Sequence, residues 1–117
     1  MKFRFEDLEI WKLVIEIAEI LFNIADGLEQ RRLYRFAEQL RGAGISMPNN
    51  IAEGSGSISK KEFINFLNMA RRSTFENANM VIIFNRRSLI SDDLSKNVLE
   101  KLDILCRKIT AFQRTLR

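Results

Sequence analysis

The sequence contains no histidine and only one cysteine and one proline among its 117 residues. Without an imidazole, the chain cannot build a Ser-His-Asp triad, a histidine proton shuttle, or a histidine-containing zinc or di-iron site. The single Cys106 excludes an internal disulfide, and its apolar surroundings at helical spacing predict a buried, reduced thiol. We therefore expect a protein that is not an enzyme, with no catalytic residue, no metal and no cofactor.

Long hydrophobic runs are also missing. The longest, such as residues 80–84, are far shorter than the ~20 residues that a membrane span needs. The early acids Glu6, Asp7 and Glu9 argue against a signal peptide. With 46% hydrophobic and 29% charged residues, the chain has the composition of one domain, 1–117, which we expect to be cytoplasmic and without a membrane partner.

Apolar residues recur at intervals of three and four along four segments, and period-two alternation is missing, which predicts an all-α fold. The first segment is expected to end at a left-handed Gly27. The third should begin at Ser59, with a capping box to Glu62 and a hydrophobic staple between Ile58 and Phe63. The fourth should begin at Ser91, whose hydroxyl can cap free N–H groups.

The second helical segment, from about residue 31 to 54, carries residues that disfavour a helix. Gly42 and Gly44 cost about 1 kcal/mol each relative to alanine, and Pro48 costs about 3 kcal/mol more. The helix could break near Met47, or it could continue with a kink if another helix packs closely on the two glycines. We favour the second outcome. Because the links are short, the predicted architecture is an antiparallel up-down-up-down four-helix bundle, with the second helix kinked near Pro48.

The charge is distributed unevenly along the chain. Residues 1–30 hold three basic and seven acidic side chains, for a net charge of −4, whereas the remaining residues hold sixteen and eight, for +8. This split suits contact with nucleic acid, contact between acidic and basic surfaces of two copies, or a mixed solvated surface. Eight basic residues are candidates for contact with phosphates: Arg31, Arg32, Arg35, Arg41, Lys60, Lys61, Arg71 and Arg72.

Exposed aromatic rings, which stack on unpaired bases, are expected to be scarce. Tyr34 is the only tyrosine, and most phenylalanines fall on core positions. Any affinity for nucleic acid should therefore be mainly electrostatic and weakly selective for sequence.

Two other features have weaker claims to chemistry. The glycines and serines of residues 54–58 resemble a phosphate loop only superficially, because no strand precedes them and the Gly-x-x-x-x-Gly-Lys spacing is missing. Glu53 and Glu76 could in principle hold a Mg²⁺ ion. We favour a structural role for both carboxylates, with Glu53 accepting hydrogen bonds near its helix end.

Three stretches resemble a known family. They are Gln39–Gly54 (QLRGAGISMPNNIAEG), the following Ser59–Phe63 (SKKEF) and the opening Phe5–Trp11 (FEDLEIW). Together they are similar to the 23S rRNA intervening-sequence proteins of bacteria, which implies a left-handed up-down four-helix bundle without known catalytic activity. The chain departs from that family where Arg71 and Arg72 replace apolar or small residues, and where Gly42 and Gly44 replace Arg and Val or Ala.

The sequence is also similar to the accessory variability protein of diversity-generating retroelements. This resemblance implies a pentameric barrel that engages nucleic acid and a reverse transcriptase. We therefore expect a homo-oligomer, with five copies favoured by the resemblance alone, that binds nucleic acid, preferably RNA, as a ribonucleoprotein accessory factor. The alternative is a protein-interaction scaffold oligomer with a protein partner and no nucleic-acid role.

Overall fold

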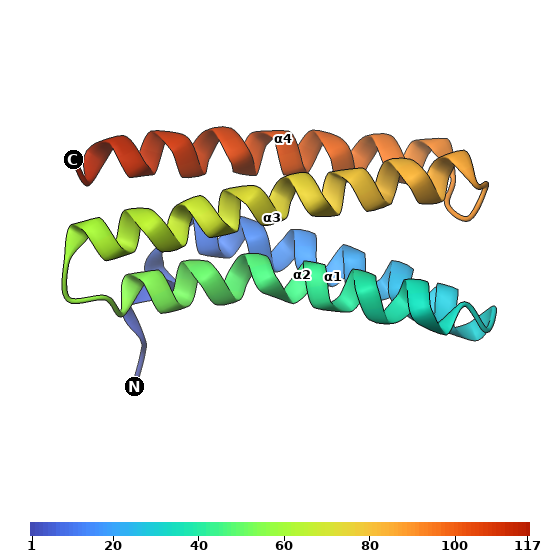
Figure 1. Cartoon of the computed structure of the whole chain (residues 1–117), viewed down its shortest axis with the longest axis horizontal. Helices are drawn as coiled ribbons and strands as arrows, with labels where there is room; N and C mark the ends of the chain where they lie inside the picture. Colours follow the sequence, from blue (N-terminus) through green and yellow to red (C-terminus); the bar gives the residue numbers. More distant parts are fainter.

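The protein consists of four long α-helices and contains no β-strand (Figure 1). The computed structural model describes the whole chain, residues 1–117. A short 3-10 helix, Arg4–Asp7, precedes α1 (Glu9–Gln30), α2 (Tyr34–Ser55), α3 (Lys60–Arg86) and α4 (Asp92–Thr115). The prediction of an all-α four-helix fold is confirmed. None of these helices is long and apolar enough to cross a membrane.

Consecutive helices run in opposite directions along a body of 44 × 26 × 21 Å (Figure 1). The links between α1 and α2 and between α3 and α4 therefore lie at the same end of the bundle, which we call the turn end (residues 31–35 and 86–91). The link between α2 and α3 lies at the opposite end together with both chain termini. We call that end the terminal end (residues 1–8, 56–59 and 116–117).

A single apolar core runs the length of the bundle. Twenty buried hydrophobic side chains from all four helices form one cluster, with fully buried Ile17 and Leu21 on α1, Leu40 on α2 and Leu105 on α4. Two ion pairs hold α4 beside α1, Lys108 Nζ to Glu9 Oε1 at 2.6 Å and Lys101 Nζ to Glu16 Oε1 at 2.9 Å. Much of the acidic charge of α1 is therefore paired within the chain.

Helix α2 runs through Pro48 without a break, so a break near Met47 is excluded. The expected close packing on the glycines is found at Gly44, where a Cβ atom would lie 3.4 Å from Phe22 Cε1 of α1. The same expectation is wrong for Gly42, which has nothing within 4 Å of the position of a Cβ atom. The tightest approach occurs at Gly54, where a Cβ atom would lie 2.7 Å from Phe66 Cβ of α3.

Helix α1 does not end at Gly27, contrary to expectation. It continues to Gln30, and the left-handed residue is Arg32, with φ of 63°. The amide of Arg32 donates to Glu29 O at 2.8 Å and that of Leu33 donates to Leu28 O at 2.9 Å, which is the Schellman pattern. Gly27 was expected to end the helix because glycine usually occupies the left-handed position after a helix, whereas here Arg32 occupies it.

The predicted starts of α3 and α4 are correct. Ser59 Oγ accepts from the amide of Glu62, and Ser91 Oγ accepts from the amide of Leu94, both at 3.1 Å. The predicted staple is wrong, because the side chain of Ile58 is fully exposed and does not cover the buried Phe63.

The thiol of Cys106 is only half-buried, contrary to the prediction that it lies in the core. It lines a shallow apolar groove between α3 and α4, together with Phe75, Ala78 and Leu99. The period of α4 correctly placed Cys106 next to apolar side chains. It could not show that α3 leaves this groove open to solvent.

Candidate nucleic-acid interface

The eight basic candidates are distributed over three parts of the bundle. Arg31, Arg32 and Arg35 lie at the turn end, and Arg41 lies about one to two helical turns into α2. Lys60 and Lys61 begin α3 at the terminal end, and Arg71 and Arg72 lie near the middle of α3. Because α2 and α3 extend along the bundle, the eight residues do not form one surface on a single chain.

Two Schellman turns place further arginines at the turn end. The turn after α3 repeats the one after α1, with the amide of Leu89 donating to Phe84 O at 2.8 Å and Ser88 left-handed at φ of 59°. This turn follows Arg86 and Arg87, just as the other contains Arg31 and Arg32. Arg86 and Arg87 were missing from the eight candidates. The up-down topology was the signal that could have added them, since it brings alternate links together.

Five arginines therefore share the turn end, and we call them the arginine group: Arg31, Arg32, Arg35, Arg86 and Arg87. All five side chains are exposed, and none forms an ion pair. The rings of Phe36 and Phe84, 5.4 Å apart between centroids, pack the start of α2 against the end of α3 and so bring the two halves of the group together. A group of unpaired guanidinium ions is suited to binding phosphate.

Three acids near the turn end have other partners, whereas Glu38 and Asp93 are exposed and form no ion pair. Asp26 and Glu29 of α1 are both paired with Arg41, at 2.8 and 3.0 Å. The hydrogen bonds that Arg41 donates to these two carboxylates raise the pKa of its guanidinium. Asp92 of α4 accepts from Asn85 Nδ2 at 2.8 Å. Arg41 is thus the candidate that is least available to a ligand, because it already holds two carboxylates.

The two arginines of mid-α3 differ in their surroundings. The guanidinium of Arg71 lies over the ring of Phe75, 5.5 Å from its centroid, and its Nε donates to Thr110 Oγ1 at 3.0 Å. Arg72 lines a polar groove of about 450 Å³ between α2 and α3, with Glu76 and the hydrogen-bonded pair Ser46 and Ser73. Arg71 therefore contributes to packing, whereas Arg72 stands beside a carboxylate.

At the terminal end, three basic side chains contact their own chain, and Arg114 and Arg117 near the end of α4 are exposed without an ion pair. Arg4 lies 5.5 Å from the centroid of Phe63 and donates to Ser55 O at 3.3 Å. Lys2 pairs with Asp7 at 2.9 Å, and its hydrogen bond and charge lower the pKa of the Asp7 carboxyl. Lys108 lowers the pKa of Glu9 in the same way. Lys60 and Lys61 are exposed and form no ion pair.

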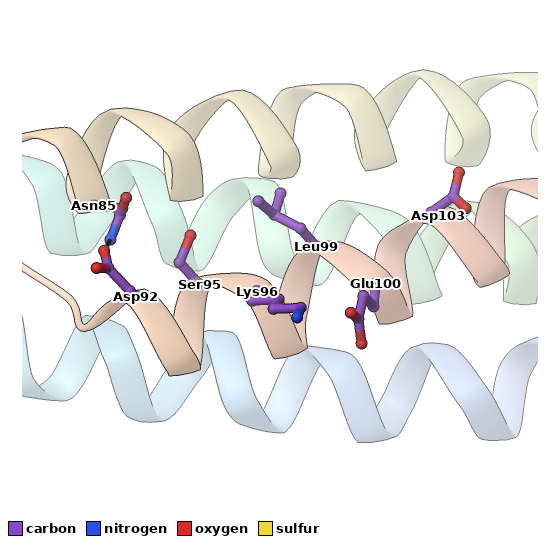
Figure 2. Close-up of a pocket in the computed structure, with 7 residues that line it drawn as sticks. All are labelled: Asn85, Asp92, Ser95, Lys96, Leu99, Glu100 and Asp103. Carbon is purple, nitrogen blue, oxygen red and sulfur yellow. Dashed lines mark hydrogen bonds between the residues drawn. The ribbon is translucent and has the colours of Figure 1, made fainter.

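A second hollow, between the end of α3 and the first half of α4, is acidic (Figure 2). Its rim carries Asp92, Glu100 and Asp103, with Lys96 as its one basic residue. Figure 2 shows that Asp92 turns toward Asn85, whereas Glu100 and Asp103 point to different sides of α4. The three carboxylates do not converge, so this hollow is suited neither to an anion nor to a metal ion.

Glu53 and Glu76 do not come together. The hydrogen bond between Ser46 and Ser73 and that from Asn77 to Ala43 O fix the register of α2 and α3, and this register sets Glu76 beside Ser46. Glu53 lies two turns further along α2, about 10 Å away along its axis. No group of three or more His, Cys, Asp or Glu side chains in the structure could hold a metal ion.

Residues 6–111 match the model of the family described as 23S rRNA-intervening sequence protein. The chain belongs to the 23S rRNA-intervening sequence protein family. The resemblance stated from the motifs is thereby confirmed for the family, and nothing in the family's description indicates catalysis. The resemblance to the retroelement accessory protein stays a prediction.

A solved structure shares the fold. It is a protein with unknown function from the S23 ribosomal protein family of Bacteroides thetaiotaomicron, with a TM-score of 0.84 and 19% sequence identity, covering 89% of this chain and 97% of that chain. At this identity the likeness establishes the four-helix fold alone. No curated protein matches the sequence.

Proposed function

We propose that this chain binds RNA or DNA electrostatically through its turn end, as a non-enzymatic ribonucleoprotein accessory factor of the cytoplasm. The observation that carries the proposal is the arginine group, five exposed guanidinium ions at one end without an ion pair among them. Such ions neutralise phosphates and release the counterions condensed on them, which supplies affinity without reading sequence. RNA is the favoured ligand, because the family is described by an intervening sequence of 23S rRNA.

The protein is further proposed to act as a homo-oligomer, with five copies on the resemblance alone. Large apolar side chains stay exposed on the single chain, among them Phe75 and Ile82 of α3 and Ile104 of α4, which supports a contact between copies. A ring would present several identical arginine groups to one strand and so raise avidity without new contacts per copy. Light scattering at micromolar concentration should give five times the 13.7 kDa subunit mass. A strictly monomeric mass would exclude the ring.

The decisive experiment on binding is charge reversal at the turn end. Arg31→Glu combined with Arg35→Glu should lower affinity for every RNA and DNA sequence alike, by about tenfold or more, while leaving helicity unchanged. In the unmodified protein, engagement of about 4 to 6 phosphates gives a slope of log affinity against log salt near −3 to −5. Fluorescence anisotropy of labelled oligonucleotides across a salt series measures both. A flat salt dependence would contradict the proposal.

A matched control is available at the other end. Lys60→Glu combined with Lys61→Glu makes the same change in net charge, on residues that are also exposed and unpaired. We expect a smaller loss of affinity, because this double variant leaves all five arginines of the turn end in place, and Arg114 and Arg117 remain as unpaired cations near the two lysines. An equal loss from both double variants would mean that net charge, and not the turn end, determines binding.

The second candidate function is a protein-interaction scaffold without a nucleic-acid role. The observation that favours it is the dispersal of the eight candidates, with Arg41 bound to two acids and Arg71 packed on Phe75. This function predicts a stable oligomer that fails to bind any oligonucleotide at moderate salt. Suppose that the purified protein is oligomeric by light scattering but does not change the anisotropy of any labelled oligonucleotide. This result would support the scaffold function over nucleic-acid binding.

A further inference from the structure

We propose that the turn end binds unpaired nucleotides, with one base stacked on the ring of Tyr34 and neighbouring phosphates held by Arg31, Arg32 and Arg35. This proposal rests on the proposed function. It specifies the class of nucleic acid as a single-stranded segment rather than a duplex. Bases of a duplex are covered by their neighbours, so an isolated aromatic ring can stack only on a base that is unpaired or at a strand end.

Tyr34 is the first residue of α2, and 58% of its surface is exposed. Three other aromatic side chains, Phe3, Phe36 and Phe75, are also exposed, and each already has a partner. Phe3 is stacked on Phe5 with centroids 5.7 Å apart, Phe36 contacts Phe84, and Phe75 lies under the guanidinium of Arg71. Tyr34 takes part in no aromatic pair and in no cation–π contact of the structure. Of the exposed aromatic rings, it alone has neither a ring nor a guanidinium as a partner.

The neighbours of Tyr34 along the chain are cationic. Arg35 follows it directly, and Arg31 and Arg32 come two and three residues before it in the turn. None of the three is engaged by a carboxylate. A base on the ring would therefore place its 5′ and 3′ phosphates among guanidinium ions. Stacking and phosphate neutralisation are the two components of single-strand binding sites in general.

The backbone holds this arrangement rigidly. The Schellman bonds of Arg32 and Leu33 fix the turn, the amide of Ala37 donates to Leu33 O at 3.0 Å, and the Phe36 ring packs on Phe84. A ring on the first turn of a fixed helix loses little conformational entropy when a base covers it, so most of the stacking free energy is retained on binding.

The conformation of Arg32 supports the same assignment. Its φ of 63° lies in the left-handed region, which disfavours every residue with a Cβ atom and which glycine adopts freely. Glycine would therefore close this turn at lower conformational cost. The presence of arginine instead places one more cation two residues before Tyr34, at the expense of local backbone strain.

The test uses three fluorescein-labelled 12-mers of equal length and charge per strand: a mixed-sequence single strand, the corresponding duplex, and a single strand with abasic sites throughout. The unmodified protein should bind the base-bearing strand about tenfold more tightly than the abasic one, because only the base-bearing strand can stack a base on the Tyr34 ring. Tyr34→Ala should remove that preference and leave the affinities for the duplex and the abasic strand unchanged. Tyr34→Phe should restore the preference.

Circular dichroism checks that each variant remains helical, and Tyr34 is exposed, so its replacement should not unfold the bundle. Tyr34→Leu keeps an apolar side chain without a π system and should bind like the alanine variant. If the protein binds all three probes through the arginine group but Tyr34→Ala changes nothing, stacking is excluded while the proposed function stands. If the protein binds none of them, both are excluded.

Discussion

Both ends of the bundle carry basic residues, but a larger share of them is unpaired at the turn end. At the terminal end, Lys2 and Lys108 are paired with acids, and Arg4 lies on an aromatic ring and bonds a carbonyl of α2. At the turn end, five arginines surround two tight turns and make no ion pair. At the terminal end the chain itself engages three basic side chains and leaves Lys60, Lys61, Arg114 and Arg117 unpaired, whereas all five arginines of the turn end are unpaired.

The comparison also extends to the backbone. At the terminal end, Gly54 lets α2 and α3 approach closely, with no room for a Cβ atom, and Ser59 caps α3. At the turn end, both left-handed positions hold residues with side chains, Arg32 and Ser88, where glycine is the usual choice. Ser59 at the terminal end and Ser91 at the turn end both follow the residue preferences for a helix start, whereas the two helix ends at the turn end depart from the usual glycine.

The largest effect on stability is expected at the terminal end. Gly54→Ala puts a Cβ atom 2.7 Å from Phe66 Cβ and 2.9 Å from Phe63 Cδ1, and this overpacking should lower the free energy of unfolding by about 2 to 3 kcal/mol. Gly42→Ala in the same helix is the matched control, because its Cβ atom meets nothing within 4 Å. The control should raise stability by about 0.5 to 1 kcal/mol. Urea denaturation measures both, and equal effects would contradict the packing of α2 on α3.

A smaller and opposite effect is expected at the turn end. Arg32→Gly and Ser88→Gly each relieve a left-handed residue and should raise the free energy of unfolding by about 0.5 to 1 kcal/mol. Only Arg32→Gly should also weaken binding to a labelled oligonucleotide, because only it removes a cation. If Arg32→Gly gains stability without losing affinity, Arg32 does not contribute to the proposed binding site.

The smallest effect on stability is expected when the pH is lowered. Hydrogen bonds and charge from Lys2 and Lys108 depress the folded-state pKa of Asp7 and Glu9. Their contribution to stability is therefore complete above the unfolded pKa, near 4, and is lost as pH falls through the lower folded values. When the pH is lowered from 5 to 2.5, the melting temperature of Glu9→Gln should fall by less than that of the unmodified protein.

Helix periodicity and serine caps were sufficient to predict the fold. The apolar residues at helical spacing in α1, α3 and α4 supply the buried side chains of these helices, and α3 and α4 begin after Ser59 and Ser91 as expected. Both features depend on local sequence. The end of α1 was misplaced because Arg32 occupies a backbone conformation that the sequence assigns to glycine. The fully exposed Ile58 shows that a matching residue pattern does not ensure a contact.

The candidate site was predictable only in part. Arg31, Arg32 and Arg35 were identified from charge, but charge alone could not separate them from Arg41, whose two carboxylate partners lie twelve and fifteen residues earlier in the chain. Charge alone also could not group Arg31, Arg32 and Arg35 with Arg86 and Arg87. These residues become neighbours only through the packing of Phe36 on Phe84. Tyr34 was counted as one of few aromatic residues, and its freedom from partners is a property of the folded surface.

The most direct test of the turn end as the binding site is a titration of ¹⁵N-labelled protein with a single-stranded 12-mer, followed by transverse-relaxation-optimised NMR. Amide signals of residues 31–36 and 84–88 should shift together and saturably, while those of Lys60 and Lys61 and of the acidic hollow on α4 stay in place. Shifts centred on residues 58–62, or spread evenly over both ends, would contradict a nucleic-acid site at the turn end.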